Sequence, residues 1–250
     1  MAIIPELIYC ADGNRKFANI AINEDYLYGA QLPGTVYFPI QFADQNWKKP
    51  NRQLYMEHIA KYRPDKATVL DLEHDNQLSE VLSWADEISQ FVNMIIIIPK
   101  VPNIIPKIPI SINGKSVRLG YSVPTKYGKT EIDLQEFFGW ANGVHLLGGA
   151  PHTQMKLVID NPNLEVLSVD TNYHHKMAIK YMSFWVHGNA VNPSYHRWWS
   201  SLRDVDGVGT WEYDGIYEAF RRSCVNIKTG WENITELPLE KRRAGRKPRL

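Results

Sequence analysis

Apolar residues in this chain gather in eight short runs, most of them separated by segments long enough to form a helix. Each run ends at polar or turn-forming residues. The runs occupy residues 7–12, 26–31, 37–44, 67–74, 94–100, 117–124, 144–149 and 165–170. Continuous apolar runs of this length are typical of strands that are buried on both faces of a parallel sheet.

The segments between the runs predict helices, because their apolar residues recur about every 3.6 positions. Helices are expected at residues 15–23, 52–62, 78–93, 133–140, 152–159 and 172–181. Two connections differ from this alternation. Pro33-Gly34 marks a short link without a helix, and Asn113-Gly114 predicts an irregular segment or a short hairpin within residues 103–115.

Eight such strands within about 165 residues predict an α/β fold, a (β/α)8 barrel of the TIM type. The alternative is an open doubly wound sheet, which favours a G-x-G-x-x-G turn after its first strand. Asp12-Gly13-Asn14-Arg15 does not match that turn. From about residue 182 the chain becomes rich in Trp and Tyr, which predicts a helical layer packed on the barrel. Residues 1–236 would then form one domain, and residues 237–250 a basic tail.

The net charge of +1 indicates no partner, but the position of the charges does. Within the tail, residues 241–249 hold six cations and no acid: Lys241, Arg242, Arg243, Arg246, Lys247 and Arg249. Such a run is typical of nucleic-acid contacts, although a solvated, disordered end has the same composition.

Two cysteines, Cys10 and Cys224, argue against a disulfide framework and are typical of a reducing cytoplasm. They also exclude a metal site made of three or four thiolates. Neither a signal peptide nor a run long enough to cross a membrane is recognisable, so a soluble cytoplasmic protein is expected.

Acidic residues stand where several of the predicted strands end. They are Asp12, Asp44, Asp71, Glu73 and Asp170. In a (β/α)8 barrel the chemistry sits at the C-terminal ends of the strands. Asp44 and Asp170 taken singly could be turn or N-cap residues. Asp71 interrupts an apolar run, where a buried carboxylate needs a partner or a ligand. We therefore expect the acids of the third, fourth and eighth strands to converge on one cavity.

Two glycine-containing segments near the predicted strand ends have two interpretations each. Gly148 and Gly149 either allow close packing or bring backbone N–H groups near a ligand. The segment Gly120-Tyr121-Ser122 has the same two interpretations, with Tyr121 available to stack on a planar base. His174 and His175 are adjacent and lack a partner at metal-ligand spacing, so we expect them to be solvated or capping residues.

In order along the chain, these segments resemble the tRNA-guanine transglycosylase superfamily, TIM barrels that exchange guanine for a 7-deazaguanine base. The resembling segments are Phe42-Ala-Asp44, Leu70-Asp-Leu-Glu73, Leu119-Gly-Tyr-Ser122, His145-Leu-Leu-Gly-Gly-Ala-Pro151 and the run end at Asp170. Two departures matter. The cysteine-rich zinc site of that superfamily is reduced to Cys224, and its fifth-strand Gln-Gly-Gly is replaced by Ile98-Pro-Lys100. The zinc-free phage enzymes that act on DNA are the more similar branch.

This resemblance implies a cytoplasmic, DNA-modifying transferase without metal or other cofactor, whose partners are DNA and a free 7-deazaguanine base; a homodimer is compatible with it. It implies that Asp170 is the nucleophile and that Asp44 handles protons or holds the base. The implied substrate-binding residues are Asp71, Glu73, Gly120, Tyr121, Ser122, Gly148 and Gly149. Two other hypotheses stay open: a non-catalytic nucleic-acid-binding barrel that assists a modifying enzyme, and an N-glycoside or nucleoside hydrolase.

Overall fold

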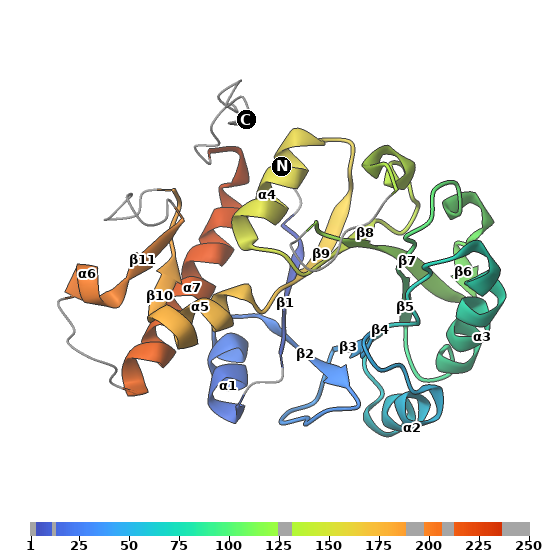
Figure 1. Ribbon diagram of the computed structural model, residues 1–250, viewed down its shortest axis with the longest axis horizontal. Coiled ribbons are helices and arrows are strands. Elements are labelled where there is room, and N and C mark those ends of the chain that lie inside the picture. The colour runs from blue at the N-terminus through green and yellow to red at the C-terminus, as the bar shows by residue number, and fades with distance from the viewer. Residues whose placement is uncertain (1–3, 12–13, 125–131, 189–197, 207–212, 237–250) are drawn as a thin grey trace, which may run out of the picture.

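Eight parallel strands close into a barrel in the computed structural model, which describes residues 4–11, 14–124, 132–188, 198–206 and 213–236 (Figure 1). The strands are β1 (Glu6–Cys10), β2 (Leu27–Leu32), β3 (Phe42–Gln45), β4 (Lys66–Thr68), β5 (Met94–Ile97), β7 (Lys115–Ser122), β8 (Val144–Leu147) and β9 (Val166–Asp170). Each pairs in parallel with the next, and β9 pairs with β1, which closes the ring. The predicted TIM-type α/β barrel is confirmed.

Five helices of the barrel lie close to their predicted positions. They are α1 (Arg15–Asn23), α2 (Arg52–Tyr62), α3 (Leu78–Ile88), α4 (Pro151–Asp160) and α5 (Tyr173–Tyr181). The bounds of α1 and α2 match the prediction, because Asn14 and Asn51 cap their first turns through their side-chain oxygens. Helix α3 ends five residues earlier than expected, where the Ser89 hydroxyl donates to the carbonyl of Asp86.

Three connections carry 3₁₀ turns: η1 (Asp75–Gln77), η2 (Ile105–Lys107) and η3 (Leu134–Phe137). The helix predicted at residues 133–140 is therefore wrong. Asp133 caps a single 3₁₀ turn, and Gly139 at φ +73° leads the chain away. The short hairpin is confirmed, since β6 (Ser111–Ile112) folds back on β7 through Asn113 and Gly114, both at positive φ.

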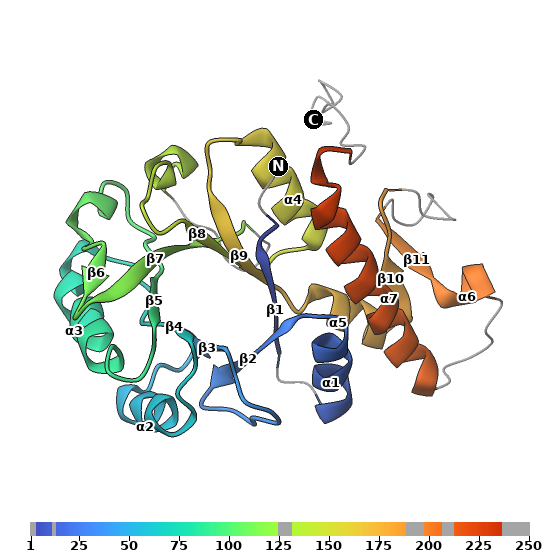
Figure 2. The ribbon, with the colours of Figure 1, turned by 180° about the vertical axis from the view of Figure 1, so that it is seen from behind.

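The described part of the C-terminal segment lies beside the barrel, next to α1 and α5 (Figures 1 and 2). It consists of β10 (Ser183–Trp185), β11 (Trp199–Ser201), α6 (Leu202–Asp206), α7 (Tyr213–Glu232) and η4 (Ile234–Glu236). The predicted helical layer is present in α6 and α7, and a short antiparallel ribbon of β10 and β11 accompanies it. Within the described residues, no helix is both long and apolar enough to cross a membrane.

Side chains fill the barrel interior in a layer below its C-terminal mouth. Ile8, Cys10, Phe42, Ile96 and Ile98 form this inner cluster. Two glycines make room for it. A Cβ atom on Gly29 would lie 2.8 Å from the Phe42 ring, and one on Gly120 would lie 2.8 Å from Ile98. The larger apolar core packs between the outer faces of the strands and the helices.

Ion pairs fill the N-terminal end of the barrel. The Lys66 ammonium lies 2.9 Å from each carboxylate oxygen of Glu6 and 3.2 Å from Asp65. The Arg118 guanidinium lies 3.5 Å from Glu6 and donates through Nε to the carbonyl of Asn142. Lys66 and Arg118 are buried, so this end is a closed floor.

Candidate functional site

A cavity of about 1160 Å³ opens at the C-terminal ends of the strands. Seven of the sequence-predicted residues line it: Asp44, Asp71, Glu73, Ser122, Gly148, Gly149 and Asp170. The volume is in the range of sites for drug-sized ligands and larger. Asp12, the remaining acid at a predicted strand end, lies outside the described residues. The acids of the third, fourth and eighth barrel strands thus face one space.

Asp170 is the last residue of β9, and one of its two carboxylate oxygens is held. The backbone N–H of Gly148 donates to Oδ1 over 3.2 Å, and Nε2 of His145 lies 3.3 Å from the same oxygen. The N-cap interpretation of Asp170 is wrong, because α5 starts at Tyr173 and Asn172 occupies the cap position. The Asp170 carboxylate is available to a ligand.

The Gly148-Gly149 turn fits closely around Asp170. Both glycines have positive φ, +65° and +80°, which disfavours any other residue type. A Cβ on Gly149 would lie 2.7 Å from Val123, whereas one on Gly148 would meet nothing within 4 Å. The buried Gln154 amide ties the turn down by donating to the carbonyls of Gly148 and Asp170. Gly148 therefore presents backbone to the cavity, and Gly149 serves close packing.

Asp44 lies on β3 and faces the same cavity as Asp170, in surroundings that favour its neutral, protonated form. Its two oxygens accept hydrogen bonds from the Gln31 amide at 3.1 Å and the Thr68 hydroxyl at 3.2 Å. Burial, followed by the charge of Asp170, raises the pKa of Asp44 to about 8, against the opposing effect of the Gln31 hydrogen bond. Asp44 is therefore mostly protonated at neutral pH and can donate a proton.

Asp71 and Glu73 follow β4 and share the ammonium of Lys100. Lys100 contacts Asp71 directly and lies 3.3 Å from Glu73. Burial raises the pKa of Asp71, while Lys100 opposes that shift. Burial lowers the pKa of Lys100, but attraction to Asp71 and Glu73 outweighs it, so the net shift is upward and Lys100 stays charged. This side of the cavity offers two carboxylate acceptors and one ammonium donor to the polar edge of a ligand.

A family model matches residues 18–232, which spans most of the barrel and the C-terminal layer. The chain belongs to the DUF6610 family. Its description is that of a family of unknown function. No curated protein and no solved structure shows significant similarity to the chain. For this DUF6610 member, function is argued from the geometry of the cavity.

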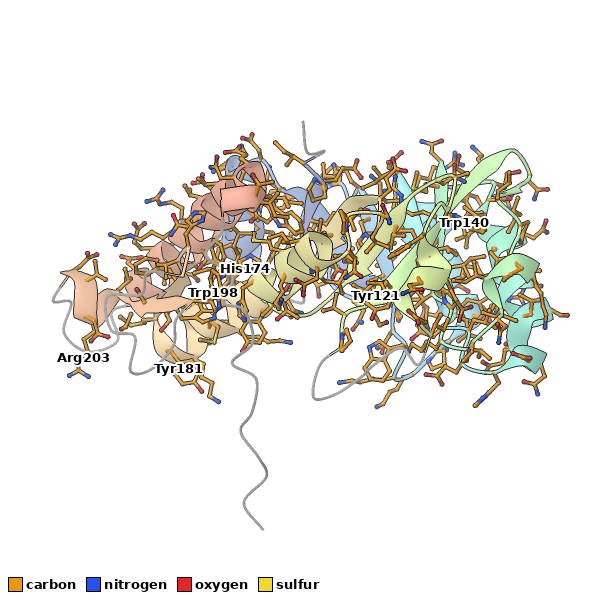
Figure 3. All side chains as sticks on the ribbon, turned by 90° about the horizontal axis from the view of Figure 1, so that it is seen from above. Tyr121, Trp140, His174, Tyr181, Trp198 and Arg203 are labelled. Atoms are coloured by element: carbon orange, nitrogen blue, oxygen red, sulfur yellow. The ribbon has the colours of Figure 1, made fainter. Side chains whose placement is uncertain are left out.

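Two of the residues expected to bind substrate do not reach the cavity. Gly120 lies one layer below it, where it makes room for Ile98 and Leu147. Tyr121 (labelled in Figure 3) points outward from β7 and meets the ring of Phe137 edge-on at 5.2 Å. Stacking of Tyr121 on a base in the cavity is therefore wrong, because neighbouring residues of a strand face opposite sides.

Two aromatic side chains that sequence analysis did not single out line the cavity and remain accessible. Trp47 is 48% exposed and follows β3, and Tyr173 is 37% exposed at the first turn of α5. The ammonium of Lys100 lies 5.8 Å from the centre of the Trp47 ring. These rings, in place of Tyr121, are positioned to stack on a planar ligand.

Sequence analysis also missed His145, Gln31 and Lys100. A signal existed for His145, since a histidine inside an apolar run, two residues before the cavity-lining Leu147, must face the barrel interior. Gln31 is the register partner of Asp44 on the adjacent strand. Lys100 belongs to a segment that departs from the family motif, and its pairing with Asp71 depends on the bridge between Leu72 and Pro99.

His174 and His175 are buried, contrary to the expectation that they are solvated (His174 is labelled in Figure 3). Within the described part of the chain, no three His, Cys, Asp or Glu side chains are arranged to hold a metal ion. The six cations of the basic tail lie outside the described residues: Lys241, Arg242, Arg243, Arg246, Lys247 and Arg249.

Proposed function

We propose that this protein is a DNA base-exchange transglycosylase that replaces guanine with a 7-deazaguanine base. The observation that carries the proposal is the pair formed by Asp170 and Asp44, two carboxyl groups that face one cavity in different environments. Asp170 accepts a hydrogen bond from the backbone N–H of Gly148, whereas Asp44 is mostly protonated near neutral pH. An acid and a nucleophile that differ in this way are the working parts of two-step displacement at a sugar carbon.

In the first step, a carboxylate oxygen of Asp170 attacks C1′ of a deoxyguanosine that has been turned out of the duplex. The bond from C1′ to the base nitrogen breaks, and its electron pair leaves with guanine. The proton on Asp44 passes to the leaving base, which departs neutral. The result is a covalent glycosyl ester on Asp170.

In the second step, the incoming 7-deazaguanine gives its ring N–H proton to the Asp44 carboxylate and attacks C1′ on the face opposite Asp170. The ester bond breaks and Asp170 regains its carboxylate. Asp44 is protonated again, so both residues return to their starting states. Two displacements retain the configuration at C1′.

The side of the cavity formed by Asp71, Glu73 and Lys100 supports recognition of a guanine-like edge. Such an edge presents N–H donors beside a carbonyl acceptor, and the two carboxylates and one ammonium complement that pattern. Trp47 lies over the same side and offers a stacking surface. Both guanine and a 7-deazaguanine present this edge, so one site serves both steps.

The test is nucleoside analysis by mass spectrometry after the protein is incubated with DNA and free 7-deazaguanine bases. We expect the deazaguanine nucleoside in DNA with wild type and none with Asp170→Ala, while a denaturation-resistant protein–DNA adduct forms only with wild type. Asp160→Ala is the matched control, since Asp160 pairs with Lys156 on the exposed end of α4.

Other outcomes discriminate between the remaining hypotheses. Base release that leaves abasic sites, with or without added deazaguanine, would identify an N-glycoside hydrolase. DNA binding without exchange or base release would identify a non-catalytic binding barrel. Unchanged exchange by Asp170→Ala would remove this residue from the mechanism.

A further inference from the structure

A chain of polar contacts crosses the barrel interior from the ion-paired floor to Asp170. Arg118 donates through Nη1 to the Ser168 hydroxyl over 2.9 Å, and that hydroxyl lies 2.8 Å from Nδ1 of His145. The other ring nitrogen of His145, Nε2, lies 3.3 Å from Oδ1 of Asp170. We call Arg118, Ser168 and His145 the buried relay; His145 and Ser168 are fully buried and Arg118 is nearly so.

The charge of Arg118 fixes the direction of hydrogen bonding along the buried relay. A guanidinium has only donors, so the Ser168 oxygen must accept from it. The hydroxyl has one hydrogen of its own, and among the described residues its remaining hydrogen-bonding partner is Nδ1 of His145. If Nδ1 carried a proton, the Ser168 hydrogen would be buried without an acceptor, which costs about 1–3 kcal/mol. Nδ1 therefore accepts.

The same reasoning places the imidazole proton on Nε2. A histidine whose Nδ1 accepts is neutral and carries its hydrogen on the other nitrogen. Nε2 makes no well-aligned hydrogen bond to any described residue. Oδ1 of the Asp170 carboxylate lies 3.3 Å away and is the acceptor that the Nε2–H proton faces.

We propose that the buried relay holds His145 as the Nε2–H tautomer and thereby fixes Asp170 through Oδ1, leaving Oδ2 as the reacting oxygen. Gly148 N–H donates to Oδ1 as well, and no described residue donates to Oδ2. The role of Oδ2 rests on the proposed function, whereas the tautomer of His145 does not. His145, Ser168 and Arg118 are positioning residues, because they act through Asp170.

The decisive measurement is a long-range ¹H–¹⁵N correlation spectrum of protein labelled at histidine nitrogens. The His145 signals are assigned by their contacts to the Phe42 ring, whose centre lies 5.1 Å from that of the imidazole, or by their absence in His145→Gln. In wild type at neutral pH we expect a protonated Nε2 and an unprotonated Nδ1. In Ser168→Ala, Nδ1 loses its donor and a mixture of both tautomers should appear.

Ser168→Ala should also lower kcat for base exchange roughly tenfold while KM stays within about twofold, since a lost charge-directed hydrogen bond changes the reacting group more than substrate binding. Ser223→Ala is the matched control: Ser223 is equally buried, but its hydroxyl bonds to Ala219 and Trp185 in the C-terminal layer. The control should leave both the His145 spectrum and kcat unchanged.

An Nδ1–H tautomer or a doubly protonated His145 in wild type would overturn the inference, and so would a Ser168→Ala spectrum identical to wild type. The expected tautomer in a protein that exchanges no base would refute the proposed function and leave the buried relay intact. The two failures are therefore distinguishable.

Discussion

The two ends of the barrel both carry charged side chains, but only one end balances them. At the N-terminal end, Lys66 and Arg118 each lie within 3.5 Å of an acid, and both contact Glu6. At the C-terminal end, Asp44, Asp71, Glu73 and Asp170 line one cavity, Lys100 is paired with Asp71 and Glu73, and two further lining cations, Lys48 and Lys176, form no ion pair with Asp44 or Asp170. Asp44 and Asp170 instead face hydrogen-bond donors and each other.

This difference separates charges that close the fold from charges that serve a ligand. In the N-terminal cluster the buried cations are satisfied by acids that are themselves partly exposed to water. The charge of Asp170 contributes to the raised pKa of Asp44, and carboxyl groups with such shifts concentrate at functional sites. In TIM barrels the C-terminal face is the catalytic one, which agrees with where the unbalanced acids lie. The buried relay joins the two ends through Ser168 and His145.

The strongest way to break this comparison is Asp44→Asn, which removes a proton carrier and leaves the hydrogen-bonding shape. We expect base exchange to fall by about 10² to 10⁴-fold, the usual contribution of a general acid. The stability of the variant relative to wild type should instead increase. The folded pKa of Asp44 is about 8 against 3.8 in the unfolded chain, so wild type loses stability as pH rises from about 4 to about 8.

The amide introduced by Asp44→Asn does not titrate, and the variant should therefore gain on wild type over that pH range, on the order of a few kcal/mol by pH 9. Urea unfolding of both proteins at pH 5 and pH 9 measures the gain. A difference in stability that does not change with pH would show that Asp44 is ionised in the fold, and the acid role would fall with it.

At the opposite end, Lys66→Met should lower stability and spare activity. The Lys66 side chain is 4% exposed, whereas its partner Glu6 is 44% exposed and can recover water once the ammonium is gone. We therefore expect a loss of about 1–3 kcal/mol, below the full penalty for breaking a buried pair. Urea unfolding and kcat are the measurements, with kcat within about twofold of wild type.

The same substitution at Lys156, whose pair with Asp160 is exposed on both sides, is the control for Lys66→Met. It should change stability by no more than about 0.5 kcal/mol. A large loss of activity in Lys66→Met, with stability preserved, would mean that the floor of the barrel takes part in the chemistry.

The sequence predicted the barrel well because parallel strands and amphipathic helices have strong local periods. The bounds of α1 and α2 matched because an Asn side chain caps the first turn of each helix. The helix expected at residues 133–140 failed because its aromatic residues face the barrel from a turn. Hydrophobicity alone does not distinguish these two cases.

The site was predicted in part, for a different physical reason. Acids at strand ends are visible in a sequence, and Asp44, Asp71 and Asp170 do share the cavity. The prediction for Tyr121 was wrong because it rested on the position of the residue in a motif. It did not consider which face of the strand the side chain occupies. Lys100 and His145 were not predicted because strand pairing in the barrel brings their partners, Asp71 and Asp170, to them. Those pairings depend on register, which the sequence expresses only weakly.

A third arrangement of titratable groups occurs in the outer layer, where α5 packs against α7. A histidine is buried there without a balancing charge. His174 is fully buried, neither ring nitrogen has a partner among the described residues, and it stacks on Phe220 at 4.9 Å. Burial, and next the neighbouring His175, lowers the pKa of His174 to about 3. The fold therefore keeps this ring neutral while the unfolded chain takes up a proton below pH 6.5.

His174→Phe should for this reason make the fold less sensitive to acid. Stability that wild type holds above pH 6.5 is lost as pH falls toward 3, and phenylalanine preserves the ring packing without binding a proton. We expect equal stabilities at pH 8 within about 1 kcal/mol and an advantage of about 2 kcal/mol for the variant at pH 5. Thermal unfolding at the two pH values measures it, with His74→Phe at an exposed position as the control. A variant that is as acid-sensitive as wild type would mean that His174 exchanges protons with solvent in the folded state. The outer layer would then contain an ionisable group that is accessible to solvent, as the cavity does.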